Sequence, residues 1–256
     1  MSLKRSIASF VRATVPPAST RVFDQVRAVL DPYAFSSYSQ EGEDIILLRL
    51  FEEQSCGFYV DVGAHHPQRF SNTFLLYKRG WRGINIDPNV DAITEFRRSR
   101  PRDVNLVLGI SNEVGELPYH RFNEPALNTF DKVLAHERKK LREYHLLSTI
   151  IVPVKRLDEV LQEHVFCGQR IDFLSVDTEG YDLKVLHSND WSRFHPRCVL
   201  VEALGSSLET LFSNPIHAHL ASVGYDLFAK TVNTLIYLER EEPKLGQQIR
   251  DSREIK

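Results

Sequence analysis

The sequence predicts a doubly wound α/β fold with a mostly parallel sheet, and three observations support this prediction. Apolar strand patterns alternate with helix-length spacers through the core of the chain, as in proteins built from βαβ units. Residues 58–62 and 83–87 form two such strands, and acids lie at or near their carboxyl ends. The chain has 256 residues, of which 42% are hydrophobic and 26% charged, as expected for one large globular domain.

The expected elements follow the chain in order. A helix is predicted over 38–53, where apolar residues recur at helical spacing. The predicted strands and helices of the core are then strands at 58–62, 83–86, 104–108, 171–176 and 198–202, and helices at 71–79, 89–98, 180–187 and 207–214. A last apolar pair, 224–229 and 233–238, predicts an antiparallel hairpin at the end of the sheet.

Segments outside this alternation define the predicted domain organisation. Residues 1–36 form a basic N-terminal helical extension, residues 37–240 the main domain, and residues 241–256 a polar tail. Three roles are open for the extension: it lies on the domain, crosses to a second subunit in a homodimer, or attaches to an anionic membrane surface. Residues 115–156 interrupt the core with a strand, a charged helix near 131–145 and another strand. Such insertions commonly carry specificity, so this one is predicted to face the substrate.

Composition argues against several classes of protein. The net charge of −2 and the pI of about 6.6 do not favour a nucleic-acid-binding protein. The three cysteines form no C-x-x-C pair, which is typical of a reducing compartment and leads us to expect a cytoplasmic protein. No apolar run reaches transmembrane length, and no continuous apolar segment predicts a cleaved signal peptide.

The ends of the first two strands predict a nucleoside site. Asp61 and Gly63 close the first strand, and Asp87 ends the second. Ligands bind at the carboxyl ends of such strands, a glycine there permits close backbone approach, and an acid ending the second strand can accept both ribose hydroxyls. A dinucleotide fingerprint would need further glycines where His65 and Gln68 stand, and no P-loop is present. A nucleoside cofactor without phosphates remains, and S-adenosylmethionine fits that description.

Further polar groups are predicted to share this crevice. Asp177 ends the strand at 171–176, Glu179 follows in the first turn of a helix, and Glu202 ends the next strand. In the pair after Gly63, one imidazole, assigned to His66, is a candidate base because histidine titrates near neutral pH. Hydrogen bonding within the turn is the alternative for His66.

The 71–73 segment (SNT) starts a helix and has the residue types of an N-cap. Ser71 and Asn72 are also placed well to hydrogen-bond a cofactor. In the turn-rich part of the insertion, Asn128 and Thr129 are predicted to contact the substrate.

Five motifs then occur in a fixed order: 38–44 (YSQEGED), 61–67 (DVGAHHP), 71–73 (SNT), 80–89 (GWRGINIDPN) and 176–182 (VDTEGYD). This set, over about residues 36–238, resembles the FkbM family of S-adenosylmethionine-dependent methyltransferases. The resemblance implies a class I methyltransferase fold, a seven-stranded Rossmann-like sheet with an antiparallel last strand. It also implies methylation of a hydroxyl on a sugar or polyketide, many family members being enzymes that tailor bacterial surface glycans.

The resemblance assigns roles residue by residue. Asp61, Gly63 and Ala64 match the motif beside the methionine part of the cofactor, and Asp87 matches the acid that holds the ribose. The remaining assigned positions are Gln40, which reaches toward the cofactor, Ser111 within the segment that borders the adenine, and Asp177 with Glu179 near the substrate.

The expected function is therefore O-methylation of a sugar hydroxyl on a bacterial glycan or glycosylated metabolite. Methyl transfer needs in-line alignment and removal of the hydroxyl proton, and Asp177, His66 and Glu179 are the candidate bases. A Mg²⁺ ion bound by Asp177 and Glu202 is an alternative means of acidifying the hydroxyl. Two other functions stay open, a nicotinamide-dependent oxidoreductase and a non-catalytic cofactor-binding module.

Overall fold

The computed structural model describes residues 33–240. Contacts divide the chain into Met1–Ser37 and Tyr38–Lys256, and the account below concerns the described part of the second unit. The predicted helical extension, apart from residues 33–36, and the polar tail lie outside the described residues.

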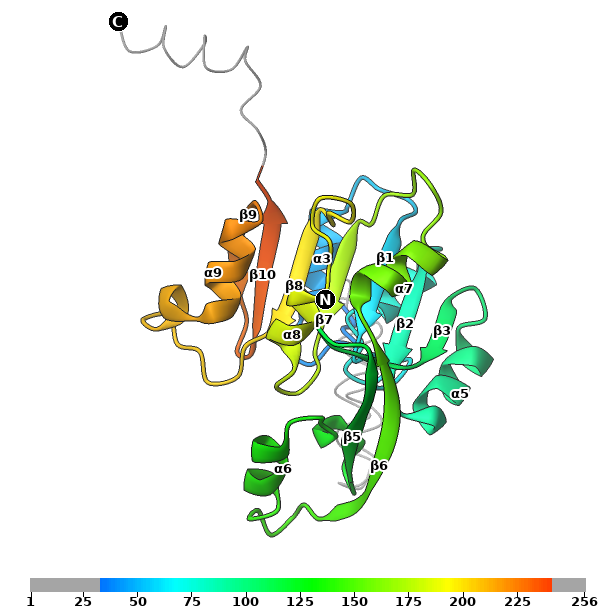
Figure 1. The fold of residues 1–256 in the computed structure, drawn as a ribbon. Helices are drawn as coiled ribbons and strands as arrows, with labels where there is room; N and C mark the ends of the chain where they lie inside the picture. Colours follow the sequence, from blue (N-terminus) through cyan, green and yellow to red (C-terminus); the bar gives the residue numbers. More distant parts are fainter. Residues whose placement is uncertain (1–32, 241–256) are drawn as a thin grey trace, which may run out of the picture. The chain divides into compact units, whose positions relative to one another are not determined.

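A seven-stranded sheet forms the centre of this unit (Figure 1), in the order β3-β2-β1-β7-β8-β10-β9. The strands are β1 (Phe58–Val62), β2 (Arg82–Asp87), β3 (Val104–Val107), β7 (Phe173–Val176), β8 (Cys198–Glu202), β9 (Tyr225–Lys230) and β10 (Thr234–Glu239). Neighbours pair in parallel except where β10 is involved, which runs antiparallel to both β8 and β9. The predicted mostly parallel sheet with an antiparallel C-terminal strand is confirmed.

Helices pack against both faces of the sheet. They are α3 (Glu43–Leu50), α4 (Phe74–Lys78), α5 (Val90–Ser99), α7 (Leu157–His164), α8 (Asp182–His187) and α9 (Pro215–Ser222). Alternation along β1 explains the two layers, because Tyr59 packs with Leu47 of α3 and Leu76 of α4, whereas Val60 packs in the cluster that includes α7, α8 and α9. None of the helices within residues 33–240 has the length and apolar character needed to cross a membrane.

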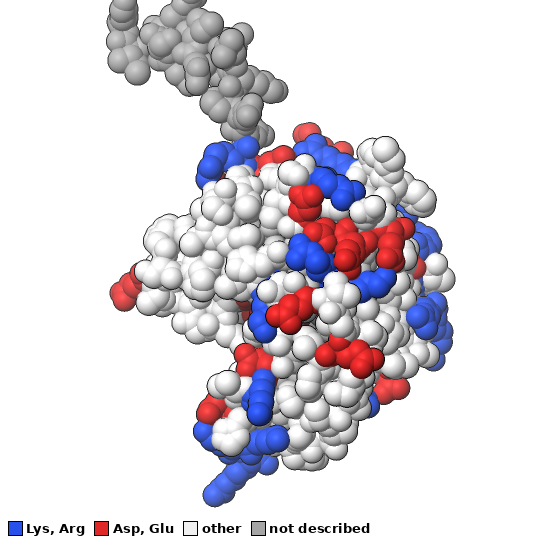
Figure 2. Space-filling model, in the orientation of Figure 1, with Lys and Arg blue, Asp and Glu red and all other residues white. Residues whose placement is uncertain are grey.

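The predicted insertion forms a small second sheet beyond the carboxyl ends of the parallel strands (Figure 1). Its order is β4-β6-β5, with β4 at Gly109–Ile110, β5 at Gly115–Phe122 and β6 at Leu146–Lys155. Between β5 and β6 lie the short 3₁₀ helix η1 (Pro125–Leu127) and α6 (Lys132–Arg138), so the predicted helix is present but shorter. Lysine and arginine side chains gather around this end in Figure 2.

The helix predicted at 207–214 is wrong. Only a 3₁₀ turn, η2 (Leu211–Ser213), forms there, and the full helix is α9. The side chain of Asn214 accepts a hydrogen bond from the Ile216 amide at 2.9 Å, which makes Asn214 the N-cap. Pro215 then occupies the first helical position, where its fixed φ and missing N–H are compatible with a helix start.

The loop before α3 is fastened to the hairpin at the far end of the sequence. Glu41 accepts hydrogen bonds from the Thr231 hydroxyl at 2.6 Å and the Asn233 amide at 2.8 Å. Gly42 has φ 89°, a left-handed conformation suited to glycine, and α3 begins directly after it, later than predicted. These contacts hold Gln40 at the edge of a cleft in the main sheet.

Candidate functional site

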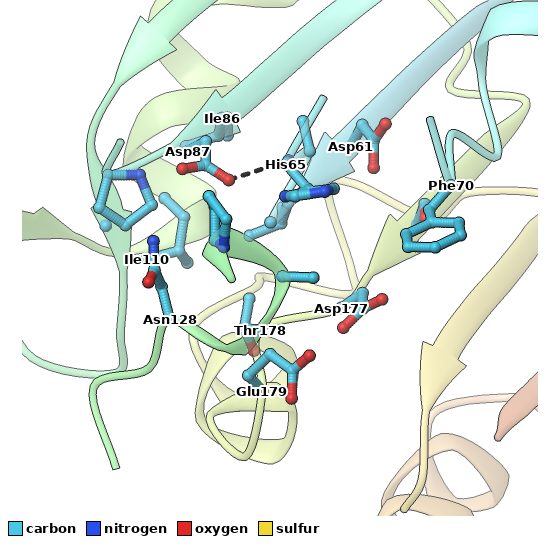
Figure 3. A pocket seen from close by; sticks show the side chains of 18 of the residues that line it. Asp61, His65, Phe70, Ile86, Asp87, Ile110, Asn128, Asp177, Thr178 and Glu179 are labelled. Atoms are coloured by element: carbon cyan, nitrogen blue, oxygen red, sulfur yellow. Dashed lines mark hydrogen bonds between the residues drawn. The ribbon is translucent and has the colours of Figure 1, made fainter. Parts of the chain in front are cut away.

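A cleft opens at the carboxyl ends of β1, β2 and β7 (Figure 3), where doubly wound sheets bind ligands. Its empty space is about 830 Å³ with the open mouth included. Most of the predicted site residues line it: Gln40, Asp61, Gly63, Ala64, Asn72, Asp87, Asn128, Asp177 and Glu179.

Gly63 brings two strand ends together at the base of the cleft. Its φ is 81°, and a Cβ atom placed there would lie 1.7 Å from the carbonyl oxygen of Asp177. Glycine is therefore required both by its backbone conformation and by the contact between the ends of β1 and β7. The atoms that occupy the space beside Gly63 are those of the protein backbone. The sequence instead predicts that glycine leaves this space for a ligand.

A buried arginine supports Asp61 from behind the cleft. The Thr73 hydroxyl donates to Asp61 Oδ2 at 3.0 Å and accepts from Arg100 Nη2 at 2.9 Å. Arg100 is fully buried and also contacts Asp103 at 3.0 Å and the Tyr59 hydroxyl at 2.6 Å. Burial raises the pKa of Asp61 to about 6, and the nearby Arg100 charge opposes the shift. This network holds the Asp61 carboxylate in one orientation.

Asp87 is positioned by two backbone amides. Its Oδ1 accepts from the Asn89 N–H at 2.7 Å and its Oδ2 from the His65 N–H at 2.9 Å. Burial raises the pKa of Asp87 to about 6 against the effect of these two bonds. Each oxygen keeps a further lone pair, so the carboxylate can still accept hydrogen bonds from two neighbouring hydroxyls.

The two histidines after Gly63 have different places. His66 does not line the cleft, and its Nδ1 accepts from the backbone amides of Gln68 at 3.0 Å and Arg69 at 2.9 Å. His65 does line it, and its buried Nε2 has no hydrogen-bond partner among the described residues. Burial lowers the pKa of His65 to about 4, so its ring is neutral at physiological pH. The base role predicted for His66 stays untested, but His65 is the imidazole at the cleft.

Backbone strain is concentrated in the same place. Within residues 33–240, three residues other than glycine have positive φ: His65 at 53°, Phe70 at 58° and Glu179 at 53°. All three line the cleft. Such conformations cost about 1–3 kcal/mol each and are typical of functional sites, where surrounding contacts hold them.

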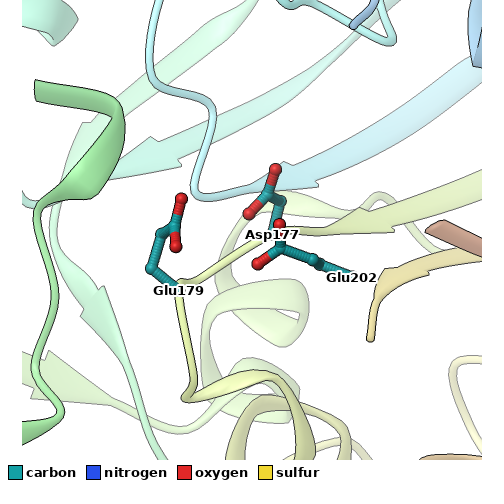
Figure 4. A group of neighbouring side chains, drawn as sticks. All are labelled: Asp177, Glu179 and Glu202. Carbon is teal, nitrogen blue, oxygen red and sulfur yellow. The ribbon is translucent and has the colours of Figure 1, made fainter. Parts of the chain in front are cut away.

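A cluster of carboxylates lies where β7 and β8 end (Figure 4). Ligand atoms of Asp177, Glu179 and Glu202 all lie within 4.8 Å of one another. The Asp177 residue is exposed to solvent at the cleft. Its carboxyl group is nevertheless surrounded by protein atoms, and this burial is the main cause that raises its pKa, followed by the charge of Glu179. The pKa of Glu202 is also raised, first by burial and then by the Asp177 charge. Because both pKa values are raised, the neighbouring Asp177 and Glu202 carboxyl groups favour sharing one proton.

The insertion is joined to this cluster through Glu179. Arg138 of α6 forms an ion pair with the Glu179 carboxylate and donates to the Leu127 carbonyl at 2.6 Å. The fully buried Thr129 hydroxyl donates to the Glu179 backbone carbonyl at 2.7 Å. Thr129, predicted as an acceptor contact, therefore has its hydroxyl committed to holding the insertion in place. Burial raises the pKa of Glu179, and Arg138 opposes that shift.

Asn128 remains available to the cleft. Its side-chain oxygen accepts from the Phe122 amide at 2.7 Å, which fixes the direction of its amide group. Tyr119 of β5 also lines the cleft, and burial together with the charge of Asp87 raises its pKa, so its hydroxyl stays protonated. The insertion thus borders the cleft near Asp87 as well as near Glu179.

Two of the predicted cofactor residues lie behind the lining. Ser71 is buried, and its hydroxyl accepts from the amide of Phe74, the first residue of α4, at 3.1 Å. The N-cap residue itself, Thr73, makes no side-chain capping hydrogen bond. Ser111 is also buried, and its amide donates to the Lys155 carbonyl at 3.0 Å. Cofactor contacts for these two residues stay predictions.

Sequence reasoning missed Arg100 and Arg138, of which Arg138 pairs with Glu179 and Arg100 reaches Asp61 through the Thr73 hydroxyl. Arginines far from the glycine motifs give no local signal, because only the folded chain brings them to those acids. Phe70 was also missed, although its position next to the polar SNT segment offered a weak signal.

Comparisons with known proteins identify a family for the chain. A family model described as the methyltransferase FkbM domain matches residues 61–227, which is more than half of the chain. Comparison with curated proteins finds no match. A solved methyltransferase from Geobacter sulfurreducens has 13% sequence identity and a TM-score of 0.42, with 92% of this chain and 96% of that chain covered.

Replacing Gly63 with alanine tests the strand-end contact. Gly168 is the matched control, because its φ of 78° is nearly the same but a Cβ atom there meets nothing within 4 Å. Gly168→Ala should cost about 1–2 kcal/mol from its left-handed backbone, and Gly63→Ala should cost about 1–3 kcal/mol more from the clash. Urea unfolding measures both, and equal losses would contradict the close approach.

Removing Arg100 tests the buried network. Arg100→Met should lower the free energy of unfolding by about 3–5 kcal/mol, because Asp103 and Asp61 lose their buried cation. The control is Arg98→Met, since the Arg98 side chain is 81% exposed and its loss should cost less than about 0.5 kcal/mol. Similar effects in the two variants would show that the network does not stabilise the fold.

Proposed function

The chain belongs to the FkbM methyltransferase family, and from that premise we propose that it transfers a methyl group from S-adenosylmethionine to a sugar hydroxyl. The acceptor would be a glycan or a glycosylated metabolite. Methyltransferase activity follows from the family itself, whereas the cofactor, the oxygen acceptor and the roles of individual residues are the proposal.

The charge of the cleft lining carries the choice of cofactor. Four carboxylates line it, from Asp61, Asp87, Asp177 and Glu179, and its lining residues include no lysine or arginine. His65, the lining histidine, is neutral because its pKa is lowered. This lining suits a cationic sulfonium and is unfavourable for the pyrophosphate of a nicotinamide dinucleotide. The observation therefore favours a methyltransferase cofactor over an oxidoreductase cofactor.

The lining also fits the parts of such a cofactor. Asp87 has lone pairs available for ribose hydroxyls, and the apolar side chains of Leu108 and Ile110 offer a surface for the adenine. Asp61, Gly63 and Gln40 surround the other end of the cleft, where we place the amino-acid portion. When bound, S-adenosylmethionine supplies an activated methyl group on its sulfonium, so the protein's task is alignment and proton removal.

Asp177 is the proposed base. Its raised pKa brings it nearer to the operating pH, which favours proton transfer from a hydroxyl. In this proposal the proton shared with Glu202 resides on Glu202, which orients the accepting oxygen of Asp177, while Arg138 is paired with Glu179 beside it. Glu179 is then better suited to bind an acceptor hydroxyl than to take its proton.

The mouth of the cleft has groups suited to a sugar. Phe70 is 41% exposed there, and the Arg69 guanidinium lies 4.3 Å from the centre of its ring. Arg69 also pairs with Glu124 of the insertion through two hydrogen bonds, of 3.0 and 3.2 Å. An aromatic face beside fixed polar groups matches the apolar faces and hydroxyls of a sugar ring.

A divalent cation at Asp177, Glu179 and Glu202 is the alternative to direct base catalysis. The three oxygen ligands suit Mg²⁺ by type. However, Glu179 is already paired with Arg138 and Glu202 carries the shared proton in our assignment, and both features reduce the charge offered to a cation. We therefore favour the base and keep the cation as the outcome that the last test of this subsection detects.

Cofactor affinity should depend on pH with a defined sign. Asp61 and Asp87 have pKa values raised to about 6, and a cationic ligand with hydroxyl donors binds their ionised forms better. Binding therefore lowers both pKa values, and affinity should fall as the pH drops through about 6. Isothermal titration with S-adenosylmethionine at pH 5 and 7.5 measures this.

Asp87→Asn is the matching variant for that titration. It should bind at least tenfold more weakly at pH 7.5, from the loss of charge-assisted hydrogen bonds worth about 1.5–3 kcal/mol each, and its pH dependence should be shallower. Binding of NAD in place of S-adenosylmethionine would instead support an oxidoreductase. Cofactor binding without turnover on any sugar acceptor would support a non-catalytic module.

Two substitutions in the carboxylate cluster separate a base from a cation. Asp177→Asn should lower kcat by about 10²–10⁴ while leaving cofactor affinity nearly unchanged. Glu202→Gln should keep most activity, because the amide preserves the hydrogen bond that a protonated Glu202 donates. Loss of activity in Glu202→Gln, together with inhibition by EDTA that Mg²⁺ reverses, would establish the cation instead.

A further inference from the structure

A second depression lies at the opposite end of the sheet, where the parallel strands begin. Its charged lining consists of four arginines, at positions 82, 102, 170 and 197, against one aspartate, Asp172. The other lining residues are polar or small: Gln54, Cys56, Gly57, Gly80 and Gln169. In Figure 2, lysine and arginine side chains also stand along the upper edge, the end at which Figure 1 places the strand starts.

The topology of the sheet explains why these arginines meet. Arg82 is the first residue of β2, and Arg102, Arg170 and Arg197 lie within three residues before β3, β7 and β8. Neighbours in the sheet are ordered β3-β2-β1-β7-β8, so an arginine stands at each of these strands except the central β1. Gly57 precedes β1, and a Cβ atom there would lie 2.5 Å from the Trp81 ring. The centre of the depression therefore stays free of a side chain.

Three of the guanidinium groups are held by hydrogen bonds, and for Arg170 the partner is an acid that also forms an ion pair with it. Arg197 donates to Gln54 at 2.8 Å, Arg102 to the Tyr77 carbonyl at 2.5 Å, and Arg170 to Glu239 at 3.0 Å. Each contact uses one nitrogen, so further N–H groups of the same fork remain available.

The other two charged residues of the lining, Arg82 and Asp172, differ in how far their side chains are free to bind a ligand. Arg82 has no side-chain hydrogen bond or ion pair within residues 33–240. The Asp172 carboxylate is occupied, since it accepts from the Phe58 amide at 2.8 Å and lies 3.6 Å from Arg197. Two of the four arginines are therefore partly neutralised, Arg170 by Glu239 and Arg197 by Asp172. Arg82 and Arg102 have no acidic partner within residues 33–240 and carry most of the available positive charge.

We propose that this depression binds an anionic ligand that carries two or more linked phosphate groups. Arginine forks match phosphate oxygens in pairs. The four arginines stand at strands β3, β2, β7 and β8. The outermost two of these strands are four spacings of about 4.8 Å apart, roughly 19 Å in all, which one phosphate group does not span. The depression encloses about 1370 Å³ with its mouth, and no large apolar side chain lines it that would insert into a bilayer. A discrete polyphosphate therefore fits better than a membrane surface.

This site is separate from the catalytic cleft. The strands between them have five or six residues in β1 and β2, a length of about 3.3 Å per residue. A ligand in the depression therefore does not contact Asp61, Asp87 or Asp177, and the proposal does not depend on the proposed function.

Isothermal titration of the full chain with sodium tripolyphosphate at low ionic strength tests the proposal. Arg82→Gln is the variant of choice, because the side chain has no described partner whose loss would disturb folding. It should weaken tripolyphosphate binding about tenfold. Arg98→Gln removes the same charge from the exposed face of α5 and should leave the affinity unchanged. S-adenosylhomocysteine affinity should be the same in all three proteins, which separates this test from that of the cleft.

Comparison probes define the ligand class. Orthophosphate should bind at least tenfold more weakly than tripolyphosphate, and added salt should weaken both. Absence of tripolyphosphate binding, equal loss in Arg82→Gln and Arg98→Gln, or equal affinity for orthophosphate would overturn the proposal. Sedimentation with phosphatidylglycerol vesicles, without binding of tripolyphosphate, would overturn it in favour of a lipid surface.

Discussion

The close approach of Gly63 to the Asp177 carbonyl is the constraint on which the site depends. β1 pairs with β2 on one side and β7 on the other, and their following loops diverge at this point. A cleft can form there only if the two strand ends stay in register, and a side chain at position 63 would separate them. The same contact places Asp61 and Asp177 on opposite sides of one small volume. Backbone packing between two strands therefore determines where the carboxylates stand before any ligand is present.

Gathering carboxylates in a shielded volume raises their pKa values, and the structure limits this effect with cations placed behind the cleft. Arg100 acts on Asp61 through Thr73, and Arg138 acts on Glu179 directly. Neither arginine lines the cleft, so the negative lining is kept for a ligand while the acids remain able to ionise. A buried ion pair contributes little net stability on average, but removal of one partner is costly. The arrangement is therefore better understood as control of charge at the site than as reinforcement of the core.

Much of the fold was predictable because the parallel strands appear in the sequence as short apolar runs that end in an acid or a glycine. Asp61, Asp87 and Asp177 follow directly from those patterns. The cleft imidazole is assigned to His66 from the sequence, but no local pattern distinguishes His66 from His65, which has a φ of 53° and is the histidine that lines the cleft. The turn-rich sequence predicts an acceptor contact for Thr129, whereas tertiary packing directs its hydroxyl to the Glu179 carbonyl. Arg100 and Arg138 carry no sequence signal at all, because their partners are brought close only by the topology.

The small net charge of −2 conceals a separation of charge along the strands. Carboxylates line the cleft at one end of the parallel strands, and arginines line the depression at the other. The peptide dipoles of a sheet contribute little to such a polarity, so side chains account for it. Each end then favours ligands of one sign and repels the other, because opposite charges in concave sites act at short range with little screening. A cationic nucleoside and a polyphosphate would therefore select different ends of the same sheet without competing, and a net charge near zero gives no indication of either preference.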